Sequence, residues 1–119
     1  MLVDTSIWVE HWRHRHLGLV SLLNRAEVQC HPFIIGELAC GSISRRSEIL
    51  ELLRRLPSVP VVENEEVMTF VEHHRLMGRG VGWVDVHLLT SATLESVLLW
   101  TADRRLATIA RSLGVYSEP

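Results

Sequence analysis

The chain has 119 residues, 47% of them hydrophobic, and a net charge of −2 at pH 7 with histidine neutral. This length and composition predict a single domain over residues 1–119 with an ample apolar core, and they exclude an intrinsically disordered chain. No apolar run is long enough to cross a membrane and no segment has the pattern of a signal peptide, so we expect no membrane partner. All 12 basic residues are arginine, and the lack of lysine excludes a P-loop and a pyridoxal Schiff base.

The first half of the chain predicts short strands that alternate with helices. Residues 2–3 form an apolar strand, and residues 6–13 have apolar side chains at helical spacing. After a polar break at residues 14–16, a leucine stripe predicts a second helix, and residues 28–30 are a weak strand candidate. Pro32 suits the first turn of a helix that ends at Gly41.

The second half repeats this alternation more clearly. A helix runs from near Ser44 to Pro57, and residues 59–62 form a strand between prolines, at the edge of a sheet. A helix around residues 67–74 leads into a glycine-rich loop at 78–82, and a further helix covers 86–96. Residues 97–100 are expected to be a strand buried on both faces, followed by a helix that Gly114 ends and a strand at 115–116. The apolar face of the helix before Pro57 is predicted to consist of Ile49, Leu50, Leu52, Leu53 and Leu56. The order predicts an α/β fold, a three-layer α/β/α arrangement with a central, mainly parallel sheet.

Two cysteines bear on the cellular compartment. Cys30 and Cys40 lie in apolar surroundings without the spacing of a metal site. We expect both to be buried, reduced thiols, which is typical of a cytoplasmic protein.

Aspartate is used sparingly in this chain. Of 14 acidic residues 11 are glutamate, and the three aspartates, Asp4, Asp85 and Asp103, each close or follow an apolar stretch. Ligands of parallel α/β sheets bind outside the carboxyl ends of the strands. Asp4 and Asp103 follow predicted strands and Asp85 begins a predicted helix, so their carboxylates are expected to converge. Helix capping explains any one of them, but for all three together we favour a common site.

Four motifs occur in the order LVDTS, IIGELACG, GWVDVHLLTSA and LWTADRRL. In order and spacing they resemble the PIN-domain ribonucleases, and specifically the VapC toxins of bacterial toxin–antitoxin pairs, over nearly the whole chain. Carried over by position, the resemblance implies a catalytic cluster of Asp4, Glu37, Asp85 and Asp103. The three aspartates would bind metal directly or through water, and Glu37 would be a further ligand or a base that orients water.

The resemblance also implies an activity and partners. Thr5 or Ser6, and Thr101, would support the acids with their hydroxyl groups. The reaction would be endonucleolytic cleavage of RNA with Mg²⁺ or Mn²⁺, leaving a 5′-phosphate and a 3′-hydroxyl. Implied partners are the RNA substrate, a cognate antitoxin that occupies a groove between the helices, and a second copy in a homodimer.

If the four acids cluster as the resemblance implies, electrostatics favours a cation among them. Two carboxylates about 5 Å apart repel by roughly 3 kcal/mol at an effective dielectric constant of about 20. Four of them cannot all stay ionised without cost, so a proton or a cation must enter. Oxygen ligands favour Mg²⁺ or Mn²⁺ over softer metals.

Arg104 and Arg105 directly follow Asp103, and we expect them to contact the scissile phosphate or its neighbour. Solvated charge on a helix surface is an equally good interpretation of each. The family often carries a further acid near Arg105, which this chain lacks.

Two alternatives remain open from the sequence. The first is a metal-independent ribonuclease that uses histidine pairs; the histidines that cluster are His11, His14, His16, His73 and His74. The second is a non-catalytic binding module whose aspartates merely cap helices, with Trp12 as the best surface candidate and Trp100 in the core. His87 is expected to be structural.

Overall fold

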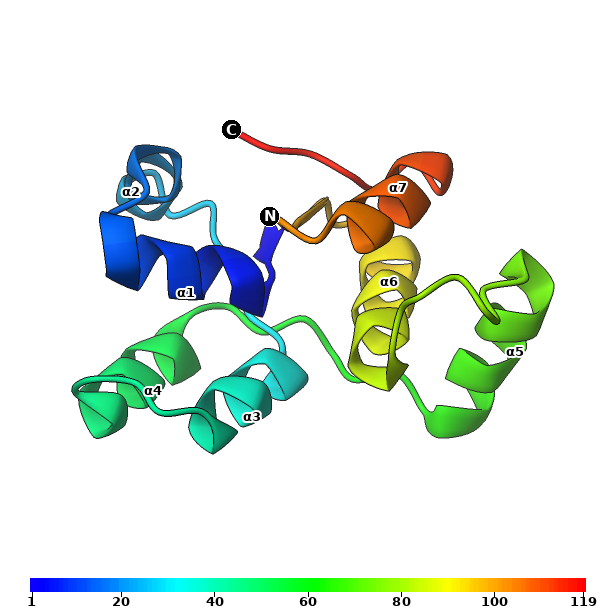
Figure 1. Cartoon of the computed structure of the whole chain (residues 1–119), viewed down its shortest axis with the longest axis horizontal. Helices are drawn as coiled ribbons and strands as arrows, with labels where there is room; N and C mark the ends of the chain where they lie inside the picture. Colours follow the sequence, from blue (N-terminus) through cyan, green and yellow to red (C-terminus); the bar gives the residue numbers. More distant parts are fainter.

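The computed structural model describes all 119 residues as an α/β fold that is mostly helical. Figure 1 shows the elements coloured along the chain. In order they are β1 (Leu2–Val3), α1 (Thr5–His14), α2 (Leu17–Asn24), α3 (Pro32–Cys40), α4 (Arg46–Arg55), α5 (Asn64–His74), α6 (Trp83–Glu95), β2 (Leu99–Trp100) and α7 (Arg104–Ser112).

The sheet is small and parallel. β1 pairs with β2, so that Leu2 lies opposite Leu99 and Val3 opposite Trp100. Single parallel bridges extend this pair on both sides, from Leu2 to Gln29 and from Leu99 to Tyr116. A further bridge joins Cys30 to Ser58. The five segments therefore lie in the spatial order 58, 29–30, β1, β2, 116. The chain order reverses at β1, and such a switch point opens a crevice at the carboxyl ends of β1 and β2.

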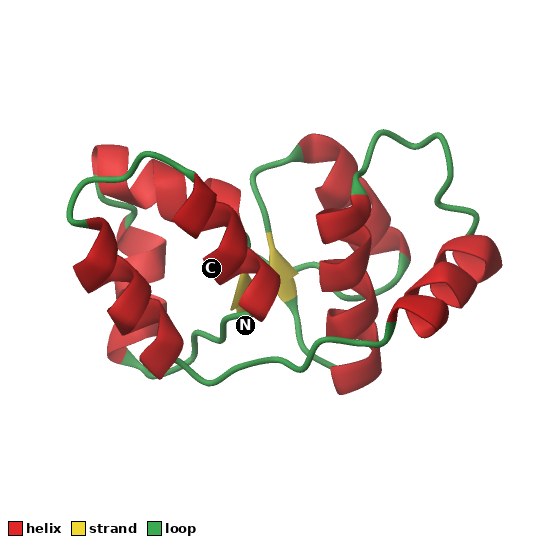
Figure 2. Cartoon of the chain, turned by 90° about the horizontal axis from the view of Figure 1, so that it is seen from below, coloured by secondary structure: helices red, strands yellow, loops and turns green.

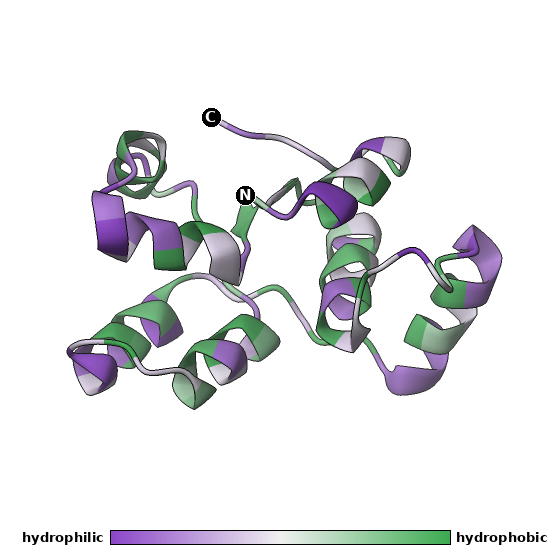
Figure 3. Ribbon diagram, in the orientation of Figure 1, coloured by the Kyte–Doolittle hydropathy of each residue, from purple (hydrophilic) through white to green (hydrophobic).

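The core surrounds these strands. Twenty-six buried residues form one hydrophobic cluster, and both residues of β1 are fully buried within it. In Figure 2 the strands lie near the centre of the molecule, with helices on either side. Figure 3 shows that the helices carry hydrophobic and hydrophilic residues together, as expected when one face of a helix packs on a core. No helix has both the length and the apolar character needed to span a membrane.

Two strand predictions were too long. Residues 59–62 form no strand: only Ser58 bridges to Cys30, with Val59 N–H donating to Cys30 O at 2.7 Å. Pro57 and Pro60 have no N–H to donate, which limits the pairing to this edge position. The strand predicted at 97–100 covers only its last two residues, and Leu98 is 44% exposed instead of buried.

Some side chains predicted to be buried lie at the surface. Leu52 is 55% exposed on α4, and Cys40, the last residue of α3, is exposed while Cys30 is buried. Among the tryptophans Trp100 is buried as predicted, but Trp83 is exposed and Trp12 only partly so. Periodicity identified these helices correctly, but it does not show which neighbouring element covers each face.

His31 begins α3 and is fully buried. Its Nδ1 accepts a hydrogen bond from Phe33 N–H (3.0 Å), which caps the helix. Its Nε2 lies 3.2 Å from Ser91 Oγ, whose own proton goes to Pro60 O (2.9 Å), so Nε2 carries the proton of a neutral ring. Burial, together with the nearby His87, lowers the pKa of His31 to about 4.

This neutral histidine predicts a pH dependence of stability. Between pH 6.5, the ordinary pKa of histidine, and about pH 4, the pKa in the folded state, His31 is protonated in the unfolded chain but stays neutral in the folded one. The free energy of unfolding should therefore be intact above pH 6.5 and fall by up to about 3 kcal/mol as the pH drops to 4. In His31→Asn, which keeps a capping acceptor but does not titrate, urea denaturation across this range should show a shallower fall. Parallel profiles for the two proteins would contradict this assignment.

Candidate active site

The pairing of β1 with β2 places Asp4 beside Thr101. Asp4 N–H donates to Trp100 O at 2.9 Å, so the residues that follow both strands meet at the crevice. Asp4 Oδ2 accepts hydrogen bonds from Thr101 Oγ1 (2.7 Å) and Ser6 Oγ (2.9 Å). Asp4 is only 6% exposed and Thr101 2%. A buried carboxylate needs hydrogen-bond donors, and the hydroxyl groups of Thr101 and Ser6 provide them.

The same hydroxyl groups connect this pair to α7. Ser6 Oγ accepts from Ala102 N–H (3.1 Å), and Thr101 Oγ1 accepts from Asp103 N–H (3.1 Å). Asp103 in turn caps α7, since its Oδ1 accepts from Leu106 N–H at 3.0 Å. Capping and convergence, which the sequence left as alternatives, occur together at Asp103.

Glu37 reaches the site from α3. Its Oε1 accepts a hydrogen bond from Thr5 Oγ1 at 2.8 Å, so the first turn of α1 holds the carboxylate although Glu37 itself is exposed. Although the residue as a whole is exposed, partial burial of its carboxyl group is the main cause that raises the pKa of Glu37. The Thr5 hydrogen bond opposes this shift, and the charges of Asp4 and Asp85 add to it.

Asp85 is the third residue of α6 and does not begin the helix as predicted, because Gly82 occupies the cap position. Its Oδ2 accepts from Gly82 N–H at 3.1 Å. Burial raises the pKa of Asp85 and this hydrogen bond lowers it, while the charges of Asp4 and Asp103 raise it further. The structure therefore brings Asp4, Glu37, Asp85 and Asp103 into one electrostatic neighbourhood.

The sequence of this chain matches the family model described as PIN domain over residues 1–112. The chain belongs to the PIN-domain family. Two curated relatives, both named Ribonuclease VapC32, come from Mycobacterium tuberculosis strains CDC 1551 / Oshkosh and ATCC 25618 / H37Rv. Each is 47% identical over 116 residues, which is 97% of this chain and 94% of the relative. The resemblance inferred from the four motifs is thereby confirmed.

The donor set of this PIN domain is chemically suited to a hard divalent cation. Asp4, Asp85 and Asp103 each use one carboxylate oxygen within the chain, while the other oxygen accepts no hydrogen bond. No group of three His, Cys, Asp or Glu side chains is already placed to hold a metal ion. An ion would therefore have to draw these carboxylates together against their mutual repulsion, which its positive charge would offset.

The two arginines of the PIN domain that follow Asp103 lie in different places. Arg105 contacts the loop before α6, where its side chain lies against Gly80. Arg104 lines a separate cleft with Arg111 and Tyr116, and the Arg111 guanidinium carbon lies 4.2 Å from the centre of the Tyr116 ring. Nothing in the sequence indicated this separation, because adjacent helix positions say little about the loops that each side chain meets.

The histidine clusters are not brought together. His11 and His16 form a local contact after α1, at 3.0 Å between His16 N and His11 Nδ1, and His73 and His74 pack on α5. α1 and α5 lie on opposite sides of the molecule in Figure 1. His87 is fully buried, packed against Phe33 and Trp83, with no hydrogen-bond partner at either ring nitrogen. The structure therefore does not join the two clusters into one site.

Burial of the Asp85 carboxylate, together with repulsion by Asp4 and Asp103, predicts that Asp85→Asn stabilises the metal-free protein. Because the pKa of Asp85 is raised above its ordinary 3.8, its ionised form is disfavoured in the folded state and costs stability at neutral pH. With EDTA at pH 7 the variant should unfold with a free energy about 1 kcal/mol higher than wild type. Asparagine can still accept the Gly82 hydrogen bond.

The extra stability of Asp85→Asn should disappear as the pH falls through the raised pKa of Asp85, because the wild-type side chain then also becomes neutral. Glu10→Gln removes an equal charge from an exposed site on α1 and should leave stability nearly unchanged. Denaturation in which Asp85→Asn is less stable than wild type at pH 7 would contradict the repulsion.

Proposed function

We propose that this PIN domain, spanning residues 1–119, is a metal-dependent endoribonuclease and the toxin of a toxin–antitoxin pair. One observation carries the proposal: four carboxylates share an electrostatic neighbourhood at the carboxyl ends of β1 and β2. Side-chain hydroxyl groups hold two of them, Asp4 and Glu37, and backbone N–H groups hold Asp85 and Asp103. A relative named as a ribonuclease, 47% identical over nearly its whole length, gives the site its chemistry.

Asp4, Asp85 and Asp103 are the proposed metal ligands, and Mg²⁺ or Mn²⁺ is the proposed ion. Their free oxygens are hard donors, and Asp4 is kept in place by the hydroxyl groups of Ser6 and Thr101. A bound divalent ion would lower the pKa of a water molecule and offset the negative charge of the phosphate.

Glu37 is the proposed base that orients the attacking water. A raised pKa brings a carboxylate closer to the pH at which it works, which favours the uptake of a proton from water. The Thr5 hydroxyl group fixes one of its oxygens and leaves the other to face water. Arg104 and Arg105 are proposed to contact phosphates of the RNA strand on either side of this cluster.

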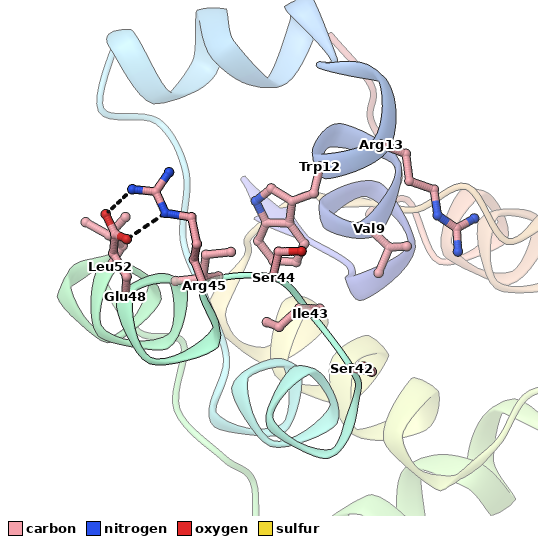
Figure 4. Close-up of a pocket in the computed structure, with 10 residues that line it drawn as sticks. Val9, Trp12, Arg13, Ser42, Ile43, Ser44, Arg45, Glu48 and Leu52 are labelled. Atoms are coloured by element: carbon pink, nitrogen blue, oxygen red, sulfur yellow. Dashed lines mark hydrogen bonds and ion pairs between the residues drawn. The ribbon is translucent and has the colours of Figure 1, made fainter.

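An antitoxin is the proposed protein partner. A cleft between α1, the segment before α4 and α4 itself combines apolar side chains, Trp12 and Ile43 among them, with Arg13 and Arg45. Figure 4 shows Trp12 pointing toward Ser44 there, and Arg45 paired with Glu48 at one end. Such a mixed surface suits an amphipathic segment of an antitoxin.

Three finer predictions stay proposals. These are the three-layer α/β/α arrangement, which the order of the five parallel segments supports, the homodimer and the cytoplasmic location.

Cleavage of RNA should require both the ion and Asp85. Purified protein free of partner, incubated with total RNA and Mn²⁺ or Mg²⁺, should produce discrete fragments, and EDTA should abolish them. Asp85→Asn should lower the rate at least about a hundredfold, because it removes a ligand and the charge that holds the ion.

The matched control is Glu10→Gln, which should cut at the wild-type rate, with folding of both variants checked by circular dichroism. Mn²⁺ should also raise the melting temperature of wild type and not that of Asp85→Asn. Cutting that survives both EDTA and the substitution would overturn the metal site. If the protein neither cuts RNA nor is stabilised by metal, it is a binding module instead of a nuclease.

A further inference from the structure

The glycine-rich loop between α5 and α6 contacts the arginine that follows the α7 cap. A β-carbon built on Gly80 would lie 2.5 Å from Arg105 Cδ, 2.7 Å from its Nη1 and 3.0 Å from its Cζ. The far half of the arginine side chain therefore lies directly on the backbone of Gly80. Only glycine leaves this space free, and its φ of +81° is one that other residues rarely adopt.

The guanidinium group of Arg105 is not used within the chain. The three ion pairs of the protein involve other arginines, and Arg105 is exposed. It is the second residue of α7, where the positive end of the helix dipole disfavours a cation. Its guanidinium group is therefore free to bind an anion from outside the chain.

The two contacting residues lie close in the chain to two of the acids. Arg105 comes two residues after Asp103, and Gly80 comes two residues before Gly82, which donates a hydrogen bond to Asp85. A long, flexible side chain two residues from a carboxylate in the chain can turn toward it. The close approach to Gly80 holds it against the loop instead.

We propose that Gly80 is a positioning residue, which seats Arg105 so that its guanidinium group binds a phosphate of the RNA strand beside the acid cluster. The inference rests on the proposed function, which includes the phosphate contact of Arg105, and adds to it the residue that orients this arginine. Bidentate binding of a phosphate needs the planar guanidinium group at a defined angle, and the glycine backbone provides the surface that sets this angle.

The loop contains its own control. Gly78 has a φ of +70°, similar to that of Gly80, but a β-carbon there would meet nothing within 4 Å. Gly78→Ala and Gly80→Ala therefore impose similar backbone strain, and only Gly80→Ala displaces Arg105. The probe is a labelled oligoribonucleotide that spans a site cut by wild type in total RNA.

Gly80→Ala and Arg105→Gln should each lower kcat/KM roughly tenfold, mainly through KM, the scale of one charged hydrogen-bond contact. Gly78→Ala should stay within about twofold of wild type. Binding of the oligoribonucleotide is measured in EDTA, which prevents its cleavage. The slope of log affinity against log salt concentration should become shallower by about 0.7 for Gly80→Ala and Arg105→Gln, and should not change for Gly78→Ala. In the Arg105→Gln background Gly80→Ala should cost no more than Gly78→Ala does.

The inference would be overturned if Gly80→Ala and Gly78→Ala lowered kcat/KM equally, or if Arg105→Gln left the salt dependence of RNA binding unchanged. Cutting that still depends on metal and on Asp85 would then leave the proposed function in place, whereas a wild type that neither cuts nor binds RNA would overturn both. Should Gly80→Ala not fold, Arg105→Gln is compared with Arg54→Gln, an equal loss of charge at an exposed position on α4. A reduced slope for Arg105→Gln alone supports the phosphate contact on which the inference rests, and equal slopes overturn it.

Discussion

The parallel pairing of β1 with β2 is the constraint on which the rest of the site depends. It joins residues that are 97 positions apart, Asp4 and Thr101, and lets the threonine hydroxyl group support a carboxylate that would otherwise be buried at high cost. Both strands are buried and only two residues long, so the surrounding helices, more than the strand hydrogen bonds, keep the pair in register. A site placed on such a pair is as rigid as the core itself.

The four acids differ in how strongly the fold holds their carboxylates. Asp4 is buried and has two hydroxyl donors, and Asp103 is part of a helix cap. Asp85 and Glu37 are held by one hydrogen bond each, while burial, with a smaller contribution from neighbouring acids, raises their pKa values. The fold therefore keeps more negative charge in one place than stability alone would favour. Excess charge of this kind is expected where a protein gives up stability for binding.

Prediction from the sequence was most successful where periodic apolar patterns are long. All seven helices were anticipated, and Pro32 and Gly41 correctly marked the ends of α3. The strands were harder, because runs such as residues 59–62 contain the right residue types but only Ser58 finds a partner. Strand pairing depends on a neighbour that is remote in the chain, so local composition overestimates its length.

The sequence by itself determined the helices, the α/β alternation, the placement of Asp4 and Asp103 after strands, and the motifs that identify the PIN-domain family. These depend on local spacing, which the order of residues contains directly. Only the tertiary structure decided which groups meet: Thr5 with Glu37, and Arg105 with Gly80 rather than with the cleft of Arg104. Such contacts join elements far apart in the chain, and they are set by how the helices pack around a shared core.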